Sequence, residues 1–275
     1  QPPADAWPGW CPTAPTRLED MLDDVLDRIR ASRLGRLDHG SVTQVRSASA
    51  LFGGDFSGTT TVGSEFSHTR LGLGVMHDLE GELVSLRSTT WRIPVNGIPE
   101  EVSPEEEIAF GIAAHGGIAH EVHFDPQLDI EGILSALDAH LLRTHVDHEH
   151  VVCALEIQGT FSDVVLRTVG HPQWEGESLG EVLDHETRFS FPQWSGTLVG
   201  FRYPDATTGS TIPGLHLHAI SDDRQSGGHV RNATTTSVTA SVWIDDLHLR
   251  QDHARPTEAG DSGSIDFGAY EGPVS

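Results

Sequence analysis

The chain has only two cysteines among its 275 residues, Cys11 and Cys153. Two cysteines cannot build a disulfide framework of several bridges or a cage of thiolate ligands around a metal. Cys153 lies in an apolar, strand-like run, which predicts a buried free thiol. No apolar run approaches the roughly 20 residues that a membrane-spanning helix requires. The composition, with 37% hydrophobic and 21% charged residues, is instead typical of a folded globular protein.

Positive charge is also scarce, since 17 Lys and Arg residues face 41 Asp and Glu residues for a formal net charge of -24. A surface this acidic repels phosphate backbones and anionic lipids, so we expect neither nucleic acid nor a membrane as a partner. An anionic substrate would need a local positive site, such as a metal ion with an arginine. The 17 histidines are therefore informative, because neutral imidazole is a common metal ligand. We expect a cytoplasmic location, with secretion as the alternative.

The first 40 residues are predicted to be an N-terminal extension with one amphipathic helix. Apolar residues recur there at helical spacing, at Leu18, Met21, Leu22, Val25, Leu26 and Ile29. Thr16 and Glu19 have the spacing of a capping box, and Gly35 suits the far end. This pattern predicts a helix over residues 17–31.

Short β-type runs with glycine-rich turns begin at about residue 42. The predicted strands are 42–47, 71–76, 82–87, 108–114 and 118–124, then 151–158, 161–169, 197–203, 213–220, 228–231 and 236–249. An apolar stripe predicts a helix over 128–142. The polar, histidine-rich segment 143–150 predicts a boundary between two halves, 41–150 and 151–275. Near the end of the second half a polar segment, 251–264, predicts a flexible tail, which ends in a weakly apolar piece, 265–274.

Three histidines form the most informative pattern in the chain. His216 and His218 are two residues apart in a predicted strand, so their side chains point to the same face. A polar segment rich in Asp and Gly follows, and His229 then returns on the next predicted strand. Three neutral nitrogen ligands with an open fourth position are typical of a catalytic metal. A His-x-His pair alone is a weak signal, and cupin barrels show similar patterns.

The stretch from Pro213 to Val230, which contains these histidines, resembles the corresponding motif of the α-acetolactate decarboxylases. Shorter matches occur in the family's order at residues 79–84, 159–161, 166–169 and 196–201. Together the matches cover roughly residues 42–275 and leave the N-terminal extension outside. The resemblance implies an α/β fold of the α+β type with two similar halves. Each half would hold a mixed or barrel-like β-sheet with flanking helices, and the C-terminal tail would return to the active site.

The resemblance also implies which residues perform the chemistry. The family's metal ligands fall on His216, His218 and His229, and its arginine falls on Arg167. Its first glutamate falls on Glu82. The tail glutamate falls on Glu271, with Glu258 as a substitute. Arg167 would hold the carboxylate or the developing negative charge, while the two glutamates would handle protons.

By this resemblance, the chain is a metal-dependent carboxy-lyase that converts 2-acetolactate to acetoin and carbon dioxide. Zinc is the default ion for three imidazoles, although other divalent transition metals bind the same ligands. No organic cofactor is expected, because the metal-bound keto group beside the departing carboxylate is its own electron sink. The family likeness further implies a homodimer.

The chain departs from the family pattern around the expected pocket. Val75 stands where the family usually has a hydroxyl residue, and Ala219 replaces a common aromatic residue. Residues 171–174 and 231–233 also differ from the usual motifs. These changes leave the predicted metal ligands intact but leave the exact substrate open.

Three other functions remain open from the sequence. The chain could act on a different or larger 2-hydroxy-3-keto acid, be a non-catalytic metal-binding module of the same fold, or be a cupin-type oxygenase or isomerase. Without the resemblance, Arg167 and Glu82 also fit exposed surface charges. For Asp222, Asp223 and Arg224 we predict a structural role, a turn with a local ion pair.

Overall fold

The computed structural model describes residues 40–144, 151–204, 211–212 and 214–250, the last six of these by their backbone alone. The helix predicted over residues 17–31 lies outside the described residues. The same holds for the tail with Glu258 and Glu271, and for most of the boundary predicted over 143–150.

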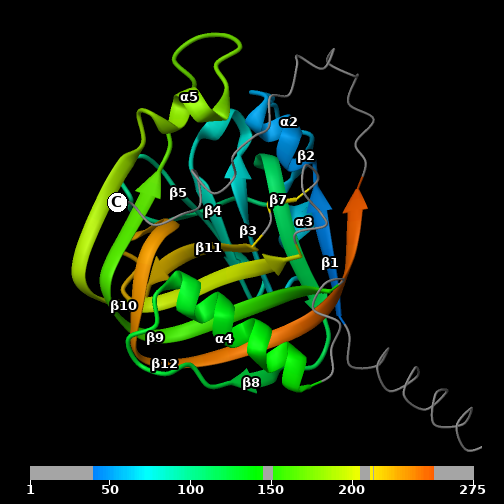
Figure 1. Ribbon diagram of the computed structural model, residues 1–275. Helices are drawn as coiled ribbons and strands as arrows, with labels where there is room; N and C mark the ends of the chain where they lie inside the picture. The colour runs from blue at the N-terminus through cyan, green and yellow to red at the C-terminus, as the bar shows by residue number, and fades with distance from the viewer. Residues whose placement is uncertain (1–39, 145–150, 205–210, 213, 251–275) are drawn as a thin grey trace, which may run out of the picture. The chain divides into compact units, whose positions relative to one another are not determined.

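The described chain is mostly β-strand, with a few short helices and one longer helix (Figure 1). The strands are β1 Gly40–Val45, β2 Thr60–Thr61, β3 Leu71–Met76, β4 Glu82–Leu86, β5 Thr89–Ile93, β6 Glu100–Glu101, β7 Glu107–Gly116, β8 His120–Val122, β9 Val152–Thr168, β10 Thr187–Tyr203, β11 Gly214–Ser221 and β12 Gly227–Arg250. The helices are α2 Ala48–Phe52, α3 Val62–Phe66, the 3-10 turn η1 His77–Leu79, α4 Ile130–Arg143 and α5 Leu179–Leu183. The α+β class with mostly β-structure is therefore confirmed.

The strands are hydrogen-bonded in the order β11-β10-β9-β12-β1-β7-β3-β4-β5-β6. Pairing is antiparallel except between β12 and β1, which run parallel. Strand β11 also pairs with β12, so β9, β10, β11 and β12 form a closed ring of pairings. This ring brings the start of β12 against both β11 and β9, where the predicted metal ligands lie.

Several predicted strands fuse into longer ones. The predicted break after residue 158 is wrong, because β9 continues through Gly159 with a φ of 148°. A Cβ there would lie 2.1 Å from the carbonyl oxygen of Ser237, so glycine lets β12 pass close by. Strand β12 likewise joins two predicted strands through bulges, and β10 begins ten residues before the predicted start at residue 197. Half-buried and exposed residues alternate along the first half of β10, so no apolar run marks this segment in the sequence.

Helix α4 covers one face of β9, β11 and β12 (Figure 1). The side chain of Asp129 caps its first turn by accepting a hydrogen bond of 2.8 Å from the backbone N–H of Gly132. Ile133, Leu137 and Leu141 are fully buried on its inner face. No helix in the described part of the chain is long and apolar enough to span a membrane.

We predict that Leu137→Ala lowers the free energy of unfolding by about 2–4 kcal/mol, because it leaves a cavity in a packed core. Leu142→Ala is the matched control on the same helix, since Leu142 is 57% exposed. It should change stability by less than about 0.5 kcal/mol. Urea unfolding measures both, and equal losses would contradict this packing.

Candidate metal centre

Strand periodicity and register bring the three predicted ligands together. His216 and His218 lie on one face of β11, while Leu215 and Leu217 pack on the opposite face in the α4 core. In the sheet register His218 lies opposite His229 of β12, and His229 lies opposite Arg167 of β9. Arg167 and His229, which are 62 positions apart in the sequence, are therefore neighbours, because β12 pairs with β9 on one side and with β11 on the other.

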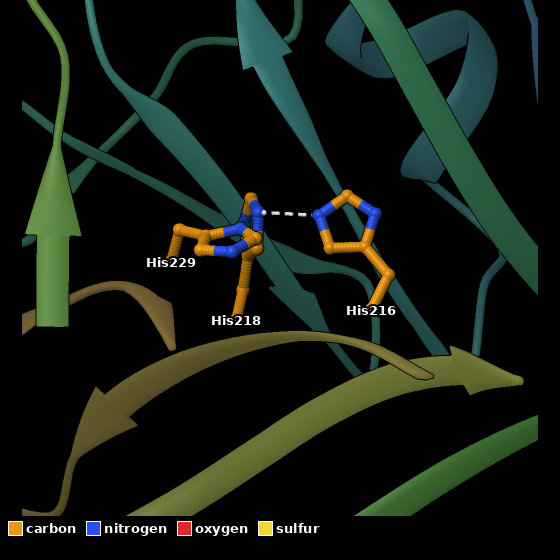
Figure 2. Close-up of side chains that lie close together, drawn as sticks. All are labelled: His216, His218 and His229. Carbon is orange, nitrogen blue, oxygen red and sulfur yellow. Dashed lines mark hydrogen bonds between the residues drawn. The ribbon is translucent and has the colours of Figure 1, made fainter. Parts of the chain in front are cut away.

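The three imidazoles face a common point (Figure 2). Their ring centroids are 5.1 Å apart for His216 and His218, 5.0 Å for His216 and His229, and 5.4 Å for His218 and His229. Each ring offers one nitrogen within 4.8 Å of the others, and all three residues are buried. Such a set of convergent neutral donors is what a divalent ion requires.

The protonation state of the cluster favours metal binding. Nδ1 of His218 lies 2.8 Å from the carbonyl oxygen of Leu83, so Nδ1–H donates and Nε2 keeps its lone pair. Burial, and then repulsion from His229, holds the pKa of His218 well below its usual value. Burial, followed by the charges of Arg167 and Arg231, does the same for the pKa of His229.

The spacing of two ligand nitrogens also fits an ion. Nε2 of His216 and Nε2 of His218 are 3.3 Å apart. Two nitrogens bound at about 2.0–2.1 Å to one tetrahedral ion lie about 3.3 Å from each other. The residues present therefore fit a tetrahedral ion such as zinc.

Arg167 and Glu82 form a buried ion pair beside the histidines. Nη1 of Arg167 donates to Oε1 of Glu82 at 2.9 Å, and each side chain is at most 7% exposed. Oε2 of Glu82 lies 3.6 Å from Nε2 of His218. Neither residue is an exposed surface charge. Two separate segments of the family resemblance, residues 79–84 and 166–169, thus meet in the structure. Glu82 begins β4, and Arg167 lies near the end of β9.

A strained turn precedes Glu82 and fixes its position. Asp78 and Leu79 have positive φ values of 52° and 55°, which are costly for residues other than glycine. Leu79 is fully buried and lines the cavity, so packing holds this conformation. Gly81 follows with a φ of 153°, and a Cβ there would lie 2.8 Å from the carbonyl oxygen of Ile93. The turn therefore aims Glu82 inward.

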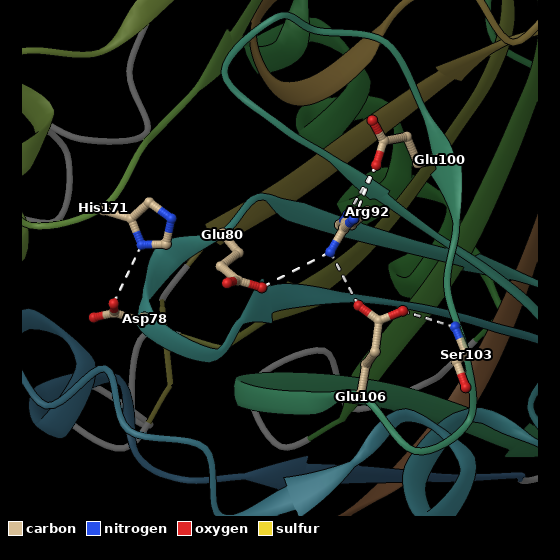
Figure 3. A network of polar contacts seen from close by, with 7 residues as sticks. All are labelled: Asp78, Glu80, Arg92, Glu100, Ser103, Glu106 and His171. Atoms are coloured by element: carbon tan, nitrogen blue, oxygen red, sulfur yellow. Dashed lines mark hydrogen bonds and ion pairs between the residues drawn. The ribbon is translucent and has the colours of Figure 1, made fainter.

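Surface ion pairs hold the outer side of this turn (Figure 3). Arg92 of β5 contacts three carboxylates, those of Glu80 at 3.8 Å and of Glu100 and Glu106 at 3.0 Å. On the other side, Asp78 lies 3.2 Å from the ring of His171. These groups are partly exposed, so each pair contributes at most about 1 kcal/mol.

A small cavity of about 40 Å³ adjoins the cluster. Glu82, Arg167 and the three histidines form its polar side. Its apolar side is formed by Leu51, Phe52, Val75, Leu79, Phe110, Val169, Leu179 and Ile212. The cavity thus has ligating and charged groups on one side and apolar side chains on the other, which is the usual lining of a small-molecule site.

The structure corrects one expectation about the pocket and supports another. Ala219 does not border the cavity, because its position in β11 alternates with the histidines and its side chain packs in the α4 core. Val75 does line the cavity, directly opposite Glu82 in the register of β3 and β4.

The polar segment after His218 forms the predicted turn, but not the predicted ion pair. Asp223 accepts from the hydroxyl of Ser221 at 2.7 Å, and Arg224 donates to the carbonyl of Ser221 at 2.6 Å. The guanidinium of Arg224 lies over the ring of Trp91, 4.9 Å from its centroid. The turn is therefore held by hydrogen bonds and a cation–π contact.

One residue near the site was missed by the sequence reasoning. Oε2 of Glu186 lies 3.4 Å from Nε of Arg167, and the side chain is 8% exposed. Its only sequence signal is a Glu-x-Arg pair with Arg188, which predicts two side chains on one strand face.

We predict that Gly228→Ala disrupts the centre. Gly228 has a φ of 138°, and a Cβ there would lie 2.4 Å from the carbonyl oxygen of Arg167. The change should push β12 from β9, displace His229 and cost about 3 kcal/mol or more. Urea unfolding and zinc titration measure the two effects.

Gly116→Ala is the matched control, because Gly116 also has a positive φ, of 60°, but has no atom within 4 Å of an added Cβ. It should cost about 1 kcal/mol from backbone strain and leave zinc affinity unchanged. Equal effects of the two substitutions would show that close packing at Gly228 is unimportant.

Comparisons with known proteins place the chain beside one family. A family model described as "Alpha-acetolactate decarboxylase" matches residues 42–255. An alpha-acetolactate decarboxylase from Klebsiella aerogenes is 31% identical over 189 residues, which cover 69% of this chain and 71% of that protein. One from Methanosarcina mazei is 29% identical, over 76% of this chain and 70% of that protein.

A solved structure of alpha-acetolactate decarboxylase from Bacillus subtilis strain 168 shares the fold. It has a TM-score of 0.67 and 23% identity, and the match covers 78% of this chain and 90% of that one. A Staphylococcus aureus protein described as similar to that enzyme gives a TM-score of 0.68 at 20% identity, over 76% and 89% of the two chains.

Proposed function

The chain belongs to the alpha-acetolactate decarboxylase family, and on this premise we propose that it converts 2-acetolactate to acetoin and carbon dioxide. The observation that carries the proposal is the meeting of His216, His218 and His229 with the Arg167–Glu82 pair in one buried cavity. The three histidines would hold a divalent ion, and zinc suits three neutral imidazoles. The bound ion supplies Lewis-acid polarisation of the substrate's oxygens.

Arg167 binds the anionic part of the substrate. Its guanidinium lines the cavity in a chain with a formal charge of -24, so it supplies the local positive charge that an anionic substrate needs. Burial strengthens this attraction because little water screens it. A planar guanidinium also orients a carboxylate through paired hydrogen bonds.

Glu82 handles the proton that replaces the departing carbon dioxide. Arg167 fixes its Oε1, which leaves Oε2 near His218 on the cavity side. A carboxyl group held in one place delivers a proton to one face of the product. We propose that Glu271 is the second proton-handling group. It lies in the tail beyond the described residues, with Glu258 as the alternative.

The apolar side of the cavity selects a small substrate. Val75, Leu79 and Phe110 line this side, so they would offer apolar contacts to the substrate's methyl groups and limit the access of water. A larger 2-hydroxy-3-keto acid is the runner-up. Ala219 does not favour this alternative, because its side chain faces away from the cavity. Val75 still favours it, because its side chain lines the cavity.

We further propose a cytoplasmic homodimer whose chain divides near residue 150 into two similar halves after a helical N-terminal extension. These features follow from the likeness to the family and from the sequence pattern. Neither nucleic acid nor a membrane is proposed as a partner, given the acidic composition.

We predict that His216→Ala abolishes both stoichiometric zinc binding and carbon dioxide release from racemic acetolactate, because two imidazoles cannot complete the ligand set. His171→Ala is the control, since His171 is largely exposed and contacts Asp78 instead. It should retain zinc and turnover. Metal analysis with an acetoin assay measures both, and a His216 variant with full metal and activity would refute the ligand assignment.

We predict that Arg167→Ala lowers kcat/KM about 100-fold or more while the zinc content stays normal, because it removes a preorganised charge from the reacting centre. Arg92→Ala, which removes a charge from the ion-pair cluster on the outer side, should change kcat/KM by less than about threefold. Loss of zinc in parallel with turnover would mean that Arg167 is structural.

A further inference from the structure

Glu186 lies between two arginines at the edge of the candidate active site. Its Oε2 is 3.4 Å from Nε of Arg167, and its Oε1 contacts Nε of Arg188. Its side chain is 8% exposed and that of Arg167 is 7% exposed, whereas that of Arg188 is 46% exposed. The carboxylate thus connects the buried guanidinium to one near the surface.

The strand register explains why a carboxylate is needed there. Arg188 of β10 lies directly opposite Arg167 of β9, so two like charges face each other across the pair. Like charges in opposed positions destabilise a sheet. Glu186 lies one residue before β10, and its side chain offsets both charges.

The carboxylates of Glu82 and Glu186 contact different nitrogens of the Arg167 guanidinium. Glu82 accepts a hydrogen bond from Nη1, whereas Glu186 faces Nε in an ion pair without a hydrogen bond, because the buried Nε has no hydrogen-bond partner. Among the described residues, no polar contact uses Nη2 of Arg167. A guanidinium attracted from one side only would turn toward Glu82 to form two parallel bonds. Attraction from Glu186 opposes that rotation.

We propose that Glu186 is a positioning residue, which holds Arg167 by its Nε edge so that Nη2 stays available to an anionic substrate. This role rests on the proposed function for what Arg167 binds, but the placement of the side chain does not. In the alternating series Arg188, Glu186, Arg167, Glu82 the four charges cancel. Loss of Glu186 would leave an uncompensated positive charge next to His229.

Glu186 lines a second, larger hollow and contacts Arg167, which lines the small cavity. That hollow has a volume of about 450 Å³ and is lined by residues of α5 together with Glu186, Arg188 and Arg231. The carboxylate therefore lies between the polar hollow and Arg167. Nε of Arg167 itself is buried.

The test compares Glu186→Gln with two variants. Asp184→Asn is the matched control, because it removes the same charge from an exposed residue that lines the same hollow. Glu186→Asp keeps the charge but shortens the side chain. We expect kcat/KM to fall about tenfold to a hundredfold in Glu186→Gln at normal zinc content, to be partly restored in Glu186→Asp and to be unchanged in Asp184→Asn.

A second readout does not depend on activity. The Nε–H signal of Arg167 is followed by ¹⁵N NMR in the zinc-free protein and is assigned by its disappearance in Arg167→Lys. We expect the signal to shift, and its exchange with water to quicken at least about tenfold, in Glu186→Gln, to change less in Glu186→Asp and to stay unchanged in Asp184→Asn. If wild-type protein releases no carbon dioxide, the proposed function fails, and the NMR result still decides whether Glu186 places Arg167.

Three results would overturn the proposal. The first is an unchanged Arg167 signal in Glu186→Gln. The second is a shifted signal with kcat/KM within twofold of an active wild type, since the placement would then not matter to the reaction. The third is a Glu186→Asp variant that is no better than Glu186→Gln, since the negative charge would then not be the cause. If Glu186→Gln does not fold, Glu186→Asp and Asp184→Asn are compared with wild type by the same two measurements.

Discussion

The candidate site depends on the register at the start of β12. His229 is paired with His218 on one side and with Arg167 on the other, so a single backbone position joins the metal ligands to the ion pair. A shift by one residue would turn His229 to the opposite face, because strand side chains alternate. The close passage of Gly228 along the carbonyl of Arg167 fixes that register, since no other residue fits there without displacement.

Electrostatics accounts for the remaining features of the site. The chain is strongly acidic, yet its candidate centre gathers buried arginine and neutral imidazoles. Burial lowers the pKa of His218 and of His229, which favours the neutral imidazole that binds an ion. The buried Arg167 is compensated by Glu82 and Glu186, since an unpaired charge in such a place is costly. One cavity thereby brings together the three imidazoles, the arginine and the carboxylate on which the proposed function rests.

The sequence predicted the local features well and the long-range ones poorly. Strand β3, most of helix α4 and the shared face of His216 and His218 follow from periodicity, which the sequence displays directly. The long strands β9 and β12 were divided, because glycine and bulges resemble turns until the partner strand is known. Glu186 was missed for a similar reason. Its importance comes from pairing β10 with β9, and no local pattern encodes that pairing.

The most direct test of the central claim is X-ray absorption spectroscopy of the zinc-loaded protein at the zinc edge. The account predicts one zinc ion per chain with three histidine nitrogens at about 2.0–2.1 Å and a light atom in the fourth position. A shell composed only of oxygen, a sulfur ligand from cysteine, or fewer than three imidazoles would contradict it.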